Sequence, residues 1–349
     1  MRPRPWDLAS PGPTPGPNLP ALSNSLFIRF FFPRFVQKAP QRSWFGPDTL
    51  IMKSPTALNR SSIPLQPSRI NLAQRLQADV KRLDGILHDV LGDDAPALIS
   101  YRRAFEQTIP RQAPAQRMKR SECIQKAARA DIVYCADNHS THGAQNVCRE
   151  LLEQMRTQGA TTLVLEIGRL EHQPDLDAFS KGEIGIAELE KRLNWGFDFH
   201  GYGGLLLRAR ELGVPLRAAN SAGSLQQRDQ VAADVITNVL KQTPDSQVLV
   251  LFGKLHLGKK HLPALVAKTQ SDKRTHTVLT GDADSYHMMV QQQQVSRAAQ
   301  LSDDTFCVYA VKPRADRKGY IRYLADLGVP MPGFAIHSSS TVTMPPKES

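Results

Sequence analysis

The sequence predicts an α/β protein in which helices cover both faces of a mostly parallel sheet, preceded by an N-terminal helical extension. Short apolar, β-prone runs alternate along the chain with stretches whose apolar residues recur every three or four positions. This alternation is typical of a parallel sheet packed between helices. At 349 residues the chain is also long enough to bury a sizeable core.

Four apolar runs are the expected strands, and a helical pattern follows each of the first three. Right-handed crossovers would then bring the carboxyl ends of all four strands to one edge of the sheet. The expected strands are residues 131–136, 161–167, 214–220 and 247–253, with later candidates at 275–280 and 305–311. The expected helices are 70–91, 95–110, 121–130, one beginning near Gly143, two short ones within 174–192, 205–212 and 224–241.

Composition predicts how the chain is divided. Residues 1–66 hold twelve prolines and little periodicity, so we expect a disordered leader, or a start that is placed too early with Met52 as the alternative. Residues 67–130 should be helices that brace the core. Residues 131–312 should form the α/β domain, and residues 313–349 a C-terminal extension with a disordered tail.

The charge distribution argues against a nucleic-acid partner. The net charge is +11, but residues 1–66 hold eight Lys and Arg against two Asp and Glu and so carry +6 of it. Residues 26–35 are apolar but too short for a membrane helix, and no signal peptide or lipoprotein-type cysteine stands out. We therefore expect a cytoplasmic protein without a transmembrane segment. The four cysteines, Cys123, Cys135, Cys148 and Cys307, should be small buried thiols.

Polar side chains stand where each of the four strands should end. Asp137 and His139 follow the first strand, Glu166 is near the end of the second, Asn220 ends the third, and His256 comes just after the fourth. Ligands of open parallel sheets bind at the carboxyl ends of the strands. One polar strand tip is ordinary, but four in four strands predict a ligand site.

Two histidines and two carboxylates are a usable set of ligands for a divalent transition metal. Asp137, His139, Glu166 and His256 could hold Mn, Fe, Co or Zn, and spacing alone does not choose among these ions. Such a metal could activate water for hydrolysis, with Asp137 as ligand or base. Asn220 could orient a ligand or stabilise an oxyanion.

These residues belong to a longer set of motifs that resembles a known family. The set includes Ala136-Asp137-Asn138-His139, Glu166, Gln-Pro-Asp-Leu-Asp-Ala-Phe at 173–179, Trp195, Tyr202-Gly-Gly, Gly213-Val-Pro, Asn220 and Gly253-x-x-His256. In this order and spacing, residues 95–312 resemble the ChaN-like haem-binding uptake domain of the Tiki superfamily. The chain departs from the family in having Asp137 where the family pattern has Glu, and in lacking a lipobox cysteine before the domain.

The resemblance implies two functions of different classes. The first is a bacterial haem- or iron-binding protein, for which Tyr202 is the candidate axial ligand and Trp195 and Asn220 are further ligand-binding candidates. The second is a metal-dependent hydrolase, of the protease or esterase kind, that uses His139, Glu166 and His256. A third hypothesis is a catalytically degenerate module that binds a partner, favoured by the Asp-for-Glu change. The expected partner is haem or a small molecule, and the sequence leaves a homodimer open.

Overall fold

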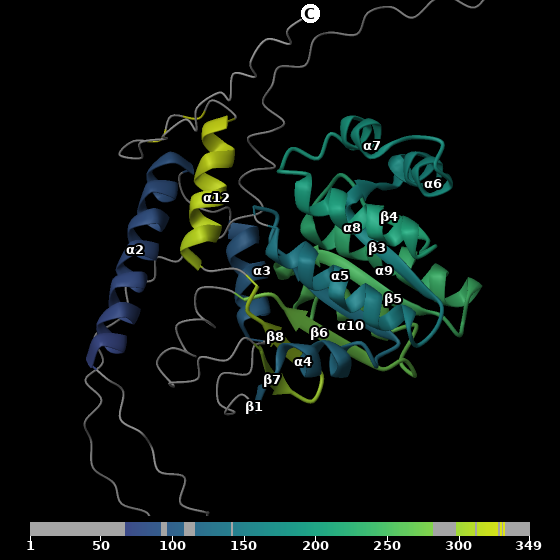
Figure 1. Ribbon diagram of the computed structural model, residues 1–349, viewed down its shortest axis with the longest axis horizontal. Coiled ribbons are helices and arrows are strands. Elements are labelled where there is room, and N and C mark those ends of the chain that lie inside the picture. Colours follow the sequence, from purple (N-terminus) through teal and green to yellow (C-terminus); the bar gives the residue numbers. More distant parts are fainter. Residues whose placement is uncertain are drawn as a thin grey trace, which may run out of the picture.

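The computed structural model describes residues 67–91, 96–107, 116–140, 142–281, 298–310, 313–326, 329 and 331. In this part of the chain eight strands form one sheet in the order β1-β7-β8-β6-β2-β5-β3-β4 (Figure 1). The pairings among β2, β3, β4, β5, β6 and β8 are parallel, whereas β7 pairs antiparallel with β1 and β8. The strands are β1 (Gln116–Met118), β2 (Ile132–Asp137), β3 (Thr161–Arg169), β4 (Leu216–Asn220), β5 (Gln247–Gly253), β6 (Thr275–Leu279), β7 (Ala298–Ser302) and β8 (Thr305–Val308).

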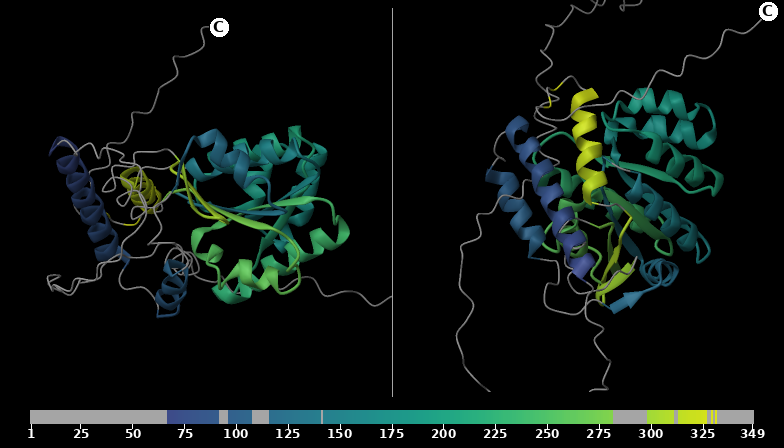
Figure 2. Two further views of the ribbon diagram at one scale, coloured as in Figure 1. Left: turned by 90° about the horizontal axis from the view of Figure 1, so that it is seen from below. Right: turned by 60° about the vertical axis from the view of Figure 1, so that its left-hand side comes forward.

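Helices lie on both sides of this sheet, as the left view of Figure 2 shows. None of the helices in the described ranges has both the length and the apolar character needed to cross a bilayer. The α-helices are α2 (Pro67–Leu91), α3 (Pro96–Glu106), α4 (Arg120–Ala127), α5 (Gly143–Arg156), α6 (Gln173–Lys181), α7 (Ile186–Leu193), α8 (His200–Glu211), α9 (Leu225–Gln242), α10 (Leu262–Ala267) and α12 (Pro313–Asp326).

The sheet has a separate apolar core on each face. Alternate residues of β2 belong to the two cores in turn, because successive side chains of a strand point to opposite faces of the sheet. Val133 and Cys135 pack with residues of α4, α5, α6, α7, α8 and α12, whereas Ile132 and Tyr134 pack with residues of α3, α9 and α10. Both faces of the central strands are therefore covered, which explains why their sequences are apolar without interruption.

The prediction of a mostly parallel α/β sheet is confirmed. The four expected strands are β2, β3, β4 and β5, and the later candidates at 275–280 and 305–311 are β6 and β8. All four cysteines are buried and free, as expected. The predicted leader at 1–66 and the predicted disordered tail lie outside the described residues, and the predicted domain boundaries stay predictions.

The helix predicted at 205–212 begins earlier than expected. Helix α8 begins at His200, so Tyr202 is on a helix. Gly201 allows α8 to approach a neighbouring segment closely, because a Cβ on it would lie 2.9 Å from the ring Nδ1 of His142. Four elements, β1, β7, α10 and α12, were not predicted from the sequence, because they are short or lack a clear apolar period.

Helix α5 contributes much of the apolar packing on one face. Leu151 is fully buried there among residues of the first core, whereas its neighbour Arg149 is exposed. We expect Leu151→Ala to lower the free energy of unfolding by about 2–5 kcal/mol, because it leaves a cavity. Urea denaturation checks this, with Arg149→Ala as the control that should change stability by less than about 0.5 kcal/mol. Equal effects of the two variants would contradict the assigned packing.

Candidate functional site

The carboxyl ends of four neighbouring strands meet at one edge of the sheet. Asp137 of β2 is in register with Gly253 of β5, and Asn220 ends β4. The pairing of β3 with β4 is interrupted by a bulge between Leu165 and Arg169, and Glu166 lies within it. A bulge redirects the side chains beside it. The structure therefore places Asp137, Glu166 and Asn220 at the edge of the sheet where the sequence predicted them.

Glu166 is the centre of this edge. Its side chain is buried, and its Oε2 accepts a hydrogen bond of 2.6 Å from the backbone N–H of Gly253. Its Oε1 accepts a hydrogen bond from Nη2 of Arg228, which is also buried. The Nε of Arg228 donates in turn to Oδ1 of Asn220 at 2.8 Å. Asn220 therefore positions the guanidinium group that pairs with Glu166.

One histidine group lies on the α5 and α8 side of the sheet. The Nδ1 of His139 lies 2.7 Å from Oδ2 of Asp137 and 2.9 Å from the hydroxyl of Tyr202. That hydroxyl also donates to Asp137, and Gln145 donates to the other carboxylate oxygen at 2.7 Å. Both oxygens of Asp137 therefore accept hydrogen bonds, and Asp137 fixes the orientation of the His139 ring.

A second histidine group of the same composition lies on the other side. His256 is in a short 3-10 helix (Lys254–Leu257) directly after β5. Its Nδ1 lies 2.6 Å from Oδ1 of Asp229, and the hydroxyl of Tyr101 donates to Oδ2 of the same carboxylate. Tyr101 is on α3, and its ring stacks on His261 at 3.7 Å between centroids. Each histidine is thus held by one aspartate and one tyrosine.

The two histidines present their Nε2 atoms to the same carboxylate. His139 Nε2 lies 3.8 Å from Oε2 of Glu166, and His256 Nε2 lies 3.6 Å from Oε1. The cluster contains three carboxylates and one guanidinium, so with both imidazoles neutral it would carry a charge of −2. The pKa of Glu166 is lowered: burial opposes this, but Arg228 and then the two histidines outweigh it.

The same charge balance acts on His139. Burial is the largest influence and lowers its pKa, but the Asp137 and Glu166 carboxylates outweigh burial, so its pKa is raised on balance. The protonated imidazole is thus favoured at this position in the folded protein. A cluster that holds a proton on one histidine can both donate and accept protons.

The residues predicted as metal ligands are brought together, but their surroundings do not fit a divalent cation. The guanidinium of Arg228 occupies Glu166 and would repel a metal ion there. Both oxygens of Asp137 already accept hydrogen bonds from His139, Tyr202 and Gln145. In the part of the chain that the structure describes, no group of three or more His, Cys, Asp and Glu is arranged to hold a metal.

The candidate haem residues lie beside the same cluster. Tyr202 is 1% exposed, and its hydroxyl is tied to Asp137. Burial, followed by Asp137, raises the pKa of Tyr202 well above its usual range, which opposes the phenolate that would bind iron. Trp195 packs edge-on against His139, with ring centroids 5.2 Å apart. The structure therefore places Trp195 against a histidine and keeps Tyr202 within a hydrogen-bond network.

Sequence reasoning missed four polar residues of the cluster. Arg228 and Asp229 were passed over within the expected helix 224–241, although they share a helix face with the buried Leu225 and Ala232. Charged residues at core-facing positions of a helix are costly unless paired, so this pattern was a signal that could have been used. Tyr101 and Gln145 showed no such signal.

Fold and site together define an α/β protein with a buried acid–histidine cluster at the carboxyl edge of its sheet. Residues 123–228 match the family described as "Haem-binding uptake, Tiki superfamily, ChaN", which confirms the resemblance over this stretch. The matched stretch contains Asp137, His139, Glu166 and Arg228 but ends before Asp229 and His256. No curated protein matches the chain.

Several solved structures are similar to this chain at low identity. ChaN of Campylobacter jejuni, described with cofacial haem binding, is 16% identical over 45% of this chain and 84% of its own, with a TM-score of 0.34. The type III effector HopBA1 is 11% identical over 49% and 86%, with a TM-score of 0.37. RRSP, a MARTX toxin effector domain from Vibrio vulnificus, is 20% identical over 52% and 40%, with a TM-score of 0.32.

The raised pKa of His139 predicts how stability depends on pH. A folded-state pKa above the unfolded value of about 6.5 contributes stability that is fully present below that value and is lost as pH rises through the folded pKa. We expect the free energy of unfolding in urea to fall above about pH 6.5, and to fall less in His139→Gln.

His276→Gln is the matched control for this measurement. Burial lowers the pKa of His276, so this residue titrates below the window and its variant should keep the slope of the unaltered protein. Equal slopes in His139→Gln and the unaltered protein would contradict the assigned electrostatics.

Proposed function

We propose that the chain is a hydrolase of ester or amide bonds whose proton transfers are carried by His139 and His256. The observation that supports this most is the presentation of two Nε2 atoms to one buried carboxylate, at 3.8 and 3.6 Å. Each imidazole is held through Nδ1 by its own aspartate, at 2.7 and 2.6 Å. An ionised carboxylate on Nδ1 keeps the proton there and leaves Nε2 to exchange protons with a substrate.

His139 and His256 have different roles in the proposed reaction. His139 holds a proton because Asp137 and Glu166 raise its pKa, so it is the proton donor to the leaving group. His256 is the base that takes a proton from the attacking water. One turnover moves a proton from His139 to the leaving group and a proton from water to His256, so the charge of the cluster does not change. His256 then releases its proton to solvent and His139 takes one up, which restores the starting state. General acid–base catalysis of this kind typically contributes 10²–10⁴-fold in rate.

The other members of the cluster are positioning residues. Asp137, which was considered as a base, orients His139, and Asp229 orients His256. Glu166 stabilises whichever imidazole is charged, and Arg228 keeps Glu166 ionised. We propose acid–base chemistry in place of the predicted metal-dependent reaction. The reason is that the guanidinium group of Arg228 already pairs with the Glu166 carboxylate, which a metal ion would need as a ligand.

The hydrolase proposal predicts that both histidines are needed for turnover. We expect His139→Ala and His256→Ala each to lower kcat/KM for a reactive ester, such as p-nitrophenyl acetate, by about 10²–10⁴-fold. The assay uses the full chain, with His276→Ala as the control that should retain activity, because His276 contacts the Ala127 carbonyl instead. Activity that chelation by EDTA abolishes and a metal restores would contradict the proposed chemistry.

Haem binding is a second candidate function. It is favoured by the family description of residues 123–228 and by the aromatic side chains that flank His139, namely Trp195 at 5.2 Å and Phe197 at 5.3 Å between ring centroids. Flat apolar ligands pack well on such rings. The buried hydroxyl of Tyr202 does not fit the role of iron ligand, so binding would depend on the aromatic side chains.

A haemin titration followed by visible absorbance tests this candidate. We expect Trp195→Ala to weaken saturable haemin binding by about 10-fold, since an aromatic side chain commonly contributes more than 1 kcal/mol to a contact. Tyr202→Phe, which keeps the ring and removes only the hydroxyl, should leave the position of the Soret band unchanged. Loss of the shifted band in Tyr202→Phe would restore Tyr202 as the ligand and contradict this assignment.

A further inference from the structure

Helix α12 is fixed beside the candidate site by contacts along its length. It lies between α2 and the body of the protein (Figures 1 and 2). Arg317 pairs with Asp84 of α2 at 2.6 Å, and both side chains are nearly buried. Tyr320 is fully buried in the first apolar core. These contacts, which lie beyond the matched stretch 123–228, hold α12 in one position relative to the sheet.

A glycine lets α12 approach the loop that carries His139. A Cβ at Gly319 would lie only 2.5 Å from the carbonyl oxygen of Ser140, so a larger residue there would push the helix and the loop apart. Ser140 directly follows His139 in the chain. The close approach therefore places the next turn of α12 over the neighbourhood of His139.

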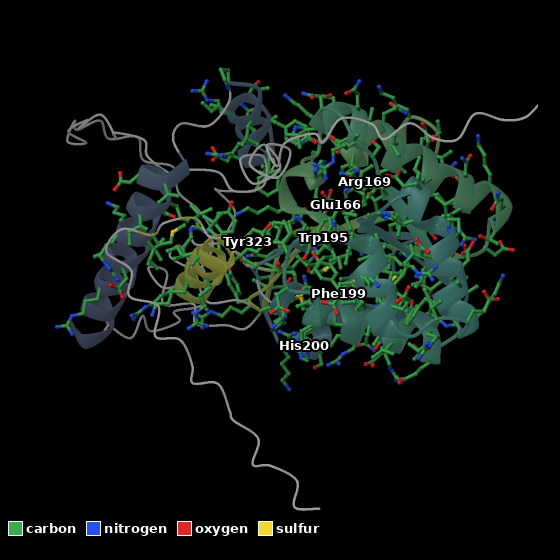
Figure 3. The ribbon with its side chains drawn as sticks, turned by 90° about the horizontal axis from the view of Figure 1, so that it is seen from above. Glu166, Arg169, Trp195, Phe199, His200 and Tyr323 are labelled. Atoms are coloured by element: carbon green, nitrogen blue, oxygen red, sulfur yellow. The ribbon has the colours of Figure 1, made fainter. Side chains whose placement is uncertain are left out.

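Tyr323 occupies that next turn, four residues after Gly319. Its ring stacks on Phe197 with centroids 4.5 Å apart and an interplanar angle of 22°. The Phe197 ring lies 5.3 Å from His139 and 5.7 Å from Trp195. Tyr323 is half-buried, whereas Trp195 and Phe197 are buried, so Tyr323 is the outer end of this aromatic run. Figure 3 labels Tyr323 on α12 and Trp195 nearer to Glu166.

We propose that Tyr323 is a specificity-determining residue that contacts an aromatic acyl group of the substrate, while the scissile bond lies at His139. This inference rests on the proposed hydrolase function and names its substrate class. Aromatic rings favour aromatic ligands over saturated ones, because ring faces and edges carry opposite partial charges. The run of contacting rings reaches from the partly exposed ring of Tyr323 to His139, so the proposed acyl group is seated at the outer end of the run with its carbonyl toward His139.

Two alkyl esters of matched shape test the preference. We expect the full-length protein to hydrolyse ethyl phenylacetate with a higher kcat/KM than ethyl cyclohexylacetate. Tyr323→Leu keeps an apolar side chain in the packing but removes the ring. It should reduce that preference by about 3- to 10-fold, mainly through KM. Tyr323→Phe should retain the preference, and Arg322→Ala, which changes the exposed neighbour on α12, should leave both rates unchanged.

Binding of two unreactive ketones tests the aromatic contact at Tyr323 independently of any hydrolysis. Phenylacetone and cyclohexylacetone have the same carbonyl and cannot be cleaved, and calorimetric titration measures their affinities directly. If the protein binds phenylacetone more tightly than cyclohexylacetone, and Tyr323→Leu removes this difference, the aromatic contact at Tyr323 is supported. If no ester is hydrolysed in the same experiments, only the hydrolase proposal fails. Equal affinities for the two ketones, or an aromatic preference that persists in Tyr323→Leu, would overturn the aromatic contact at Tyr323 even if esters are cleaved.

Discussion

One buried ion pair organises the carboxyl edge of this sheet. An ionised Glu166 in the protein interior costs several kcal/mol unless it is paired and hydrogen-bonded. Arg228 supplies the opposite charge and Gly253 supplies a backbone donor. These groups come from α9 and from the end of β5, while Glu166 comes from β3. The three segments must therefore be in register for the charge to be satisfied, and this requirement fixes the shape of the site.

The two histidines depend on opposite faces of the sheet. His139 contacts the hydroxyl of Tyr202, a residue of α8 that packs in one apolar core. On the other face, Tyr101 of α3 packs in the second core and donates to Asp229, the carboxylate that orients His256. The cluster thus needs both helical layers. It also needs α3, which precedes the matched stretch 123–228, so the N-terminal helices contribute a side chain to the candidate site in addition to packing.

Local patterns predicted the fold and the main polar residues because both are properties of short segments. The apolar runs of β2, β3, β4 and β5 are recognisable without knowledge of their neighbours, and strand connectivity then brings their polar ends together. The roles of these residues were not local. Glu166 was predicted to be a metal ligand, and its pairing with Arg228 was not predicted, because an arginine within an amphipathic helix is usually solvated. The helix that carries Tyr202 was predicted to begin only at residue 205, because glycines are unfavourable within helices.

The sequence by itself determined the class of fold, the edge of the sheet where the site lies, and the residues Asp137, His139, Glu166, Asn220 and His256 that stand there. Only the tertiary structure decided which of these groups are paired. It joined Arg228 to Glu166, Asp229 to His256 and Tyr202 to Asp137 across 62, 27 and 65 positions of sequence. The physical reason is that the charge state of a buried group is set by its neighbours in space, and sequence patterns report only its neighbours along the chain.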